Sequence, residues 1–182
     1  MQRFTKFTLL LLLFQAAIHT WASPLTLQSA ADDAGKALLK LFTYDAGGKL
    51  LHTGTAFFVS AQAEGVTTYT LMQGAARAEV IDAKGKKYAV SRILGANSTT
   101  DLVKFSVEGV KKCGFMQPAS TPASKGSHLF MLPAGATKKS QPVIVSVTDT
   151  EAYNQWLYYQ TSAENEDDVF GLPLFNENGE VA

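Results

Sequence analysis

From residue 37 onward, the chain alternates short runs of β-branched and aromatic residues with turn sequences. Two such turns are Asp45-Ala46-Gly47-Gly48 and Lys84-Gly85-Lys86, which have the residue types that join antiparallel strands. The pattern predicts strands at 37–44, 50–60, 66–71, 78–82, 88–94 and 102–107. Six short strands joined by tight turns are typical of a small antiparallel barrel.

The same alternation starts again after residue 111. The segment GSHLFML at 126–132 echoes GTAFFVS at 54–60. Further strands are expected at 142–148, 155–161, 171–175 and from 181 onward. We therefore expect an all-β fold with two antiparallel barrels, one at 37–110 and one at 111–182, connected near 111–115.

The first 22 residues have the pattern of a secretory signal peptide. Arg3 and Lys6 precede an apolar run that contains five consecutive leucines, and small residues stand at the two positions read for cleavage. The run is shorter than the ~20 residues that a membrane span needs, so we expect a soluble, exported protein in the periplasm or outside the cell. A short lead-in helix is expected at 23–36, with Ser29 and Asp32 at capping-box spacing.

Charge and cysteine content narrow the classes of partner. Without Arg3 and Lys6 the chain keeps 14 basic and 16 acidic side chains, which does not favour nucleic acid or an anionic membrane. Cys113 is the only cysteine. It packs as a small apolar residue, or it forms an intermolecular disulfide or a reactive thiol. No residues have metal-ligand or phosphate-loop spacing, so neither a metal nor a cofactor is expected.

Four segments carry motifs in a fixed order. They are GTAFFVS at 54–60, TTYTLMQGA at 67–75, DLVKFSV at 101–107 and DDVFGLPLFNENGEV at 167–181. Together they resemble the trypsin-like (chymotrypsin-fold) serine proteases, above all the exported bacterial HtrA/Deg-type group. The resemblance implies two six-stranded barrels. In that group a further strand and a helix follow the Asn-x-x-Gly turn, whereas this sequence reaches Ala182, so we expect a truncated second barrel.

The resemblance also assigns three positions to the catalytic triad, and two of them carry residues that cannot perform its chemistry. Thr70 stands where the family has its histidine, Phe170 stands at the nucleophilic serine, and only Asp101 is kept. Phenylalanine has no nucleophilic atom, and threonine cannot act as a base near neutral pH. We expect Asp101 to accept a hydrogen bond from Thr70 or another donor, and the ring of Phe170 to be mostly buried.

The oxyanion site and the specificity pocket are also altered. Asp168 and Leu172 replace glycines of the family loop, while Gly171 is kept, so we expect a rearranged loop without a preformed oxyanion hole. Glu164 falls where the family lines the base of its specificity pocket. It could attract a basic side chain there, or it belongs to a solvated acidic loop at 164–168.

The sequence therefore predicts a catalytically inactive trypsin-like homologue that acts as a binding or regulatory module, with a peptide or protein as its partner. One alternative is an active peptidase with displaced catalytic residues, for which the sequence offers His52, His128, Ser60 and Ser162. Another is a structural scaffold domain of the cell envelope.

Overall fold

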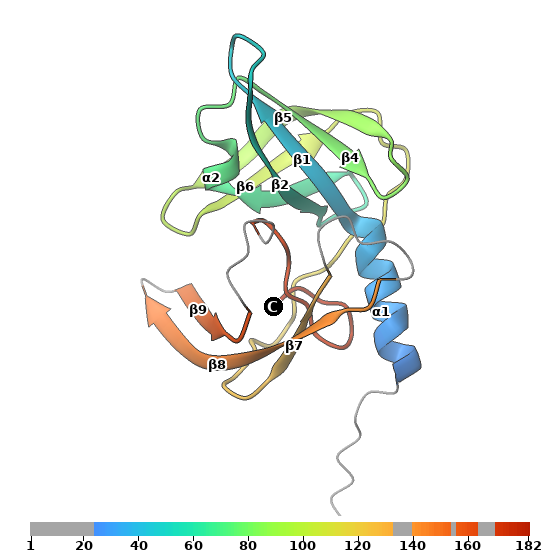
Figure 1. Ribbon diagram of the computed structural model, residues 1–182, viewed down its shortest axis with the longest axis vertical. Helices are drawn as coiled ribbons and strands as arrows, with labels where there is room; N and C mark the ends of the chain where they lie inside the picture. Colours follow the sequence, from blue (N-terminus) through green and yellow to red (C-terminus); the bar gives the residue numbers. More distant parts are fainter. Residues whose placement is uncertain (1–23, 133–139, 154–155, 164–169) are drawn as a thin grey trace, which may run out of the picture.

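The computed structural model describes residues 24–132, 140–153, 156–163 and 170–182. They form one long helix, a closed barrel and a smaller second sheet (Figure 1). The expected signal peptide at 1–22 and two predicted site residues, Glu164 and Asp168, lie outside the described residues. No described helix is long and apolar enough to cross a membrane.

Helix α1 (Pro24–Ala37) runs directly into the first strand, β1 (Leu38–Tyr44). Ser29 lies inside this helix, so the capping-box reading of Ser29 and Asp32 was wrong. Ala31, Ala34 and Ala37 recur at every third position and are almost fully buried. This spacing puts them on one helical face, and they pack in a cluster with residues of both halves of the molecule. The helix therefore holds the two halves together through its small side chains.

The first barrel closes with the strand order β1-β2-β3-β6-β5-β4. Its other strands are β2 (Leu50–Phe58), β3 (Glu64–Thr68), β4 (Arg77–Asp82), β5 (Lys87–Asn97) and β6 (Leu102–Val107). Every neighbouring pair is antiparallel. The six strands expected from the sequence are thus confirmed, and strand alternation is the reason that the prediction worked.

One boundary in this barrel differs from the prediction. The strand expected at 66–71 ends at Thr68, and Tyr69–Met72 form a single helical turn, α2. Leu71 points into the barrel core from this turn. Three apolar or aromatic residues in the sequence YTLM fit a strand and a buried turn equally well, so periodicity could not separate them.

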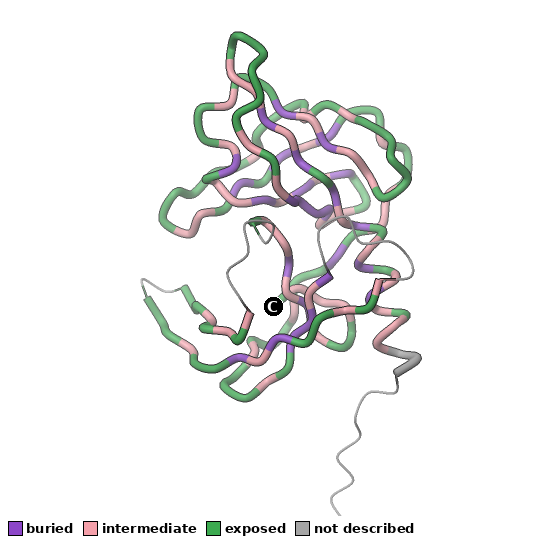
Figure 2. Tube along the Cα trace, in the orientation of Figure 1, coloured by how far each residue is buried: buried purple, intermediate pink, exposed green. Residues whose placement is uncertain are grey.

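The second half forms a partial sheet of three antiparallel strands, β7 (His128–Met131), β8 (Val143–Tyr153) and β9 (Trp156–Thr161). The strand expected at 171–175 is reduced to isolated bridges of Phe175 with Phe130 and Val181, and Val181 also bridges Pro118. A closed barrel with a partial second sheet matches the truncated double barrel that was expected. Figure 2 shows many exposed positions along β8 and β9.

Candidate functional site

The turn α2 and the loop before β6 are tied together by Asp101. The backbone N–H of Tyr69 donates to the Asp101 carbonyl oxygen over 2.9 Å. The Thr70 backbone N–H donates to Asp101 Oδ1 over 2.7 Å, and the Thr70 hydroxyl donates to the same oxygen over 2.9 Å. The expected hydrogen bond between Thr70 and Asp101 is therefore confirmed.

Asp101 holds this position in an unusual backbone conformation. Its φ is 53°, in the left-handed region that side chains other than glycine seldom adopt. Aspartate is among the residues that tolerate it best, because its short polar side chain bonds to nearby backbone. The side chain is half-buried, whereas Thr70 is exposed. One carboxylate oxygen is thus occupied by threonine donors, and the Thr70 hydroxyl cannot replace a histidine as general base near neutral pH.

The side chain of Phe170 is more exposed than the sequence predicted. Its side chain is 50% exposed, so the expectation of a mostly buried ring was wrong. Its carbonyl oxygen accepts a hydrogen bond from the Thr55 backbone N–H over 3.0 Å. The loop therefore presses its backbone, rather than its aromatic side chain, against strand β2.

Gly171 explains why the backbone can come so close. Its φ is 80°, and a Cβ at this position would overlap the carbonyl oxygen of Thr55 and lie 3.0 Å from Thr67 Oγ1. Thr67 is fully buried and donates its hydroxyl to that same Thr55 carbonyl over 2.8 Å. The glycine, the two threonines and the Phe170 carbonyl make one tightly packed junction between the loop and the first barrel.

A second close approach completes the junction on the barrel side. A Cβ at Gly54 would overlap the side chain of Leu71 and lie 3.2 Å from the Phe170 carbonyl oxygen. Three of the four sequence motifs thus meet here, through Gly54, Thr67 and Gly171. Thr67 is three residues before Thr70, which links the junction to the Thr70–Asp101 pair along strand β3 and the start of α2.

The four residues that the sequence offered as replacement catalytic groups make hydrogen bonds with nearby residues. The backbone of His52 bonds to the Thr43 hydroxyl, and the Ser60 hydroxyl accepts from the Glu64 N–H. His128 Nδ1 lies 3.3 Å from the hydroxyl oxygen of Ser146, and the backbone N–H of Ser146 donates to Ser162 Oγ over 2.9 Å. The His128–Ser146 pair was missed from the sequence, because only the β7–β8 register places these residues opposite each other.

Cys113 is a free, half-buried thiol. Burial raises its pKa, and its Sγ donates weakly to the Ser60 carbonyl oxygen over 3.6 Å. A thiol with a raised pKa is a poor nucleophile at neutral pH. In the described part of the chain, no group of three or more His, Cys, Asp or Glu residues could hold a metal ion.

The arrangement of strands, helix and loop has close counterparts among solved structures. No family model and no curated protein matches the sequence. The HtrA-type protease AlgW, solved with a tripeptide, superposes with a TM-score of 0.69 at 18% sequence identity, and the match covers 85% of this chain. A serine-to-alanine variant of the same protease, also with a tripeptide, gives the same values. The protein has the trypsin-like protease fold.

This likeness concerns the fold and not the chemistry, because the identity is low. The match spans 52% of the length of the AlgW chain. Within this fold, the residues that the family resemblance placed in the site fall into two groups. Thr70 bonds directly to Asp101, and Phe170 and Gly171 pack on strand β2 near Thr55 and Thr67.

Proposed function

We propose that this protein is a catalytically inactive trypsin-like domain that binds a peptide or a protein. The observation that carries the proposal is the double donation of Thr70 to Asp101 Oδ1. In an active triad the aspartate accepts a hydrogen bond from the histidine and orients it. Here the corresponding carboxylate oxygen is already occupied by two donors, neither of which can act as a general base.

The environment of Phe170 supports a binding role. A half-exposed aromatic ring at the position of the nucleophile offers apolar area to a ligand rather than filling the site. The two protease structures with the same fold each hold a tripeptide. The expected ligand of this protein is a peptide or an exposed protein segment with an apolar side chain at the point that contacts Phe170. The signal-peptide pattern of the sequence supports export to the periplasm or to the outside of the cell as part of this proposal.

The first test separates binding from hydrolysis. The protein is incubated with a fluorophosphonate probe that labels activated serines, beside an active trypsin-like protease as the positive control. We expect no labelling of this protein. Specific labelling that requires native folding would overturn the proposal.

The second test separates binding from a purely structural role. A peptide array is probed with the wild-type protein, with Phe170→Ala and with Phe115→Ala. Phe115 is 41% exposed and lies outside the junction, so it controls for the loss of any exposed ring. We expect Phe170→Ala alone to weaken binding about tenfold. Equal loss in both variants, or no peptide binding at all, would favour a scaffold.

The His128–Ser146 pair favours one alternative, an active hydrolase with displaced residues. A histidine nitrogen near a serine hydroxyl is the minimal nucleophile and base arrangement. Labelling by the fluorophosphonate probe that disappears in Ser146→Ala and persists in Ser162→Ala would support this alternative.

A further inference from the structure

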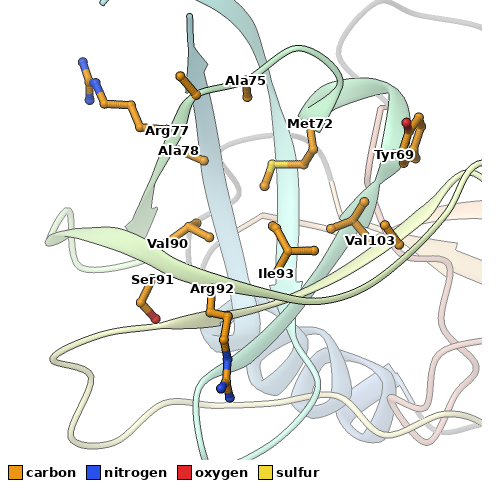
Figure 3. A pocket seen from close by; sticks show the side chains of 12 residues that line it. Tyr69, Met72, Ala75, Arg77, Ala78, Val90, Ser91, Arg92, Ile93 and Val103 are labelled. Carbon is orange, nitrogen blue, oxygen red and sulfur yellow. The ribbon is translucent and has the colours of Figure 1, made fainter. Parts of the chain in front are cut away.

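A cavity of about 280 Å³ opens in the first barrel, away from the Phe170 junction. It lies where β4 and β5 separate. These strands pair at only three positions, 79–81 with 87–89. Beyond them, Ala78 and Arg77 stay with β1, and the β5 residues from Val90 onward stay with β6. The gap between the two strands is covered at one end by α2 and the turn after it (Figure 3).

Most side chains that line the cavity are apolar, and four are polar, of which two are basic. Figure 3 shows Met72, Ile93 and Val103 around the middle of the cavity, with alanines at its edges. The polar side chains of the lining are those of Tyr69, Ser91, Arg77 and Arg92, and the lining contains no carboxylate. The Ser91 hydroxyl is already bonded to Ser106. A ligand would therefore meet apolar walls and positive charge.

The two arginines differ in whether their guanidinium groups are free to pair with a ligand. The Arg77 guanidinium is held by Glu79 over 2.9 Å and stacks on the Tyr44 ring, with its Cζ 3.8 Å from the ring centroid. Arg92 is exposed, and its guanidinium has no ion pair or hydrogen bond within the described residues. Both side chains extend away from the cavity in Figure 3. An unpaired, exposed arginine can turn over the mouth at the cost of side-chain entropy.

We propose that this cavity binds an unbranched aliphatic carboxylate, with the chain among Met72, Ile93 and Val103 and the carboxylate paired with Arg92. Charge complementarity favours the anionic head, because Arg92 is the one charged group of the lining without an ion pair among the described residues. The volume of about 280 Å³ lies just below the ~300–1,000 Å³ typical of ligand pockets, which suits one short flexible chain. Met72 adapts its shape readily to such a chain. Arginine and carboxylate form a charge-assisted, often bidentate pair.

The full chain is titrated with octanoate while amide chemical shifts are recorded by nuclear magnetic resonance. We expect saturable binding with a dissociation constant of about 1 mM or tighter, and the shifts should concentrate on residues 72–78 and 90–96. Octyltrimethylammonium has a similar chain with the opposite charge and should bind more weakly. Acetate lacks the chain and should not saturate.

Two variants of the arginines give a matched comparison. Arg92→Gln should weaken octanoate binding about tenfold, and it should remove the preference for octanoate over octyltrimethylammonium. Arg77→Gln makes the same chemical change at a guanidinium that is already engaged, so its effect should stay below about threefold. Ala75→Leu reduces the cavity and should weaken binding at least about fivefold.

Several outcomes would overturn the assignment. They are the absence of saturation, equal binding of the cationic and anionic probes, shifts that map elsewhere, and equal effects of the two arginine variants.

An N-acetylated tripeptide with a C-terminal leucine has a carboxylate on a branched apolar group. Tighter binding of this tripeptide at the same residues would show that the cavity accepts a peptide terminus instead of an acyl chain.

Discussion

Thr70 and Asp101 are joined by two hydrogen bonds to a single oxygen, because the backbone N–H and the hydroxyl of Thr70 both donate to Asp101 Oδ1. The loop before β6 is thereby fixed to the turn α2. Asp101, which the family resemblance matches to the triad aspartate, is thus hydrogen-bonded without a histidine, and this motivates the first prediction.

Restoring the missing triad residues should not restore an ordinary protease. Thr70→His alone and Phe170→Ser alone should leave casein hydrolysis undetectable, because triad members act as a unit and losing the serine or the histidine costs about a millionfold. The double variant should remain poor as well. Asp168 and Leu172 still replace loop glycines, and one oxyanion donor contributes about 3 kcal/mol to transition-state stabilisation.

Casein cleavage by the double variant at the rate of a typical trypsin-like protease would contradict this prediction. It would mean that the loop already holds a productive shape. Adding glycine at positions 168 and 172 should affect the rate of the double variant more than it would affect the rate of an intact enzyme.

Gly171→Ala should be strongly destabilising, by about 3 kcal/mol or more in urea unfolding. The added Cβ would overlap the Thr55 carbonyl, and the residue would keep a positive φ. Gly85→Ala is the matched control, since Gly85 has a φ of 81° but nothing within 4 Å of an added Cβ. That change should cost about 1 kcal/mol from backbone strain alone. Equal losses in the two variants would refute the close packing of the loop on β2.

Thr67→Val should lower the free energy of unfolding, whereas Thr68→Val should leave it unchanged or raise it. The buried Thr67 hydroxyl donates to the Thr55 carbonyl, so its loss should cost about 1–3 kcal/mol. Thr68 Oγ1 is buried without a hydrogen-bond partner in the described part of the chain. Replacing it with a methyl group of similar shape should be neutral, or stabilising by up to about 1 kcal/mol. Urea unfolding of both variants checks the pair, and a Thr68→Val loss as large as that of Thr67→Val would count against the assignment.

Glu79 should make a small, pH-dependent contribution to stability. A hydrogen bond from Lys87 is the largest cause that lowers the pKa of this carboxyl, with smaller contributions from Tyr44 and Arg77. A lowered pKa stabilises the folded protein above the unfolded-state pKa, and this stabilisation is lost as the pH falls through the folded-state pKa. Glu79→Gln should therefore lower stability at neutral pH by less than about 1 kcal/mol, because the group is partly exposed.

The difference between Glu79→Gln and the wild type should vanish in acid. Urea midpoints measured from neutral pH down to about pH 2 follow this change. Glu108→Gln is the control, at an exposed carboxylate with no ion pair among the described residues. A constant difference across the whole pH range would show that Glu79 acts through packing rather than charge.

The sequence by itself determined the first barrel and the Thr70–Asp101 pair. Alternating side chains and turn residues are local signals, so the six strands could be placed to within a few residues from the pattern alone. Motif order then matched Thr70 with Asp101, although they belong to different segments of the chain. The helix expected at 23–36 is observed at 24–37, and only the capping box at Ser29 was wrong, because Ser29 lies inside the helix.

Only the tertiary structure decided how the Phe170 loop sits and where the cavity opens. The exposure of Phe170 follows from a hydrogen bond to Thr55 and from the space left by Gly171, and both contacts join segments far apart in the chain. The cavity likewise exists because β4 and β5 pair at only three positions, after which β4 pairs only with β1 and β5 only with β6. Such features depend on how elements pack against each other, and a local pattern of apolar and polar residues does not encode that packing.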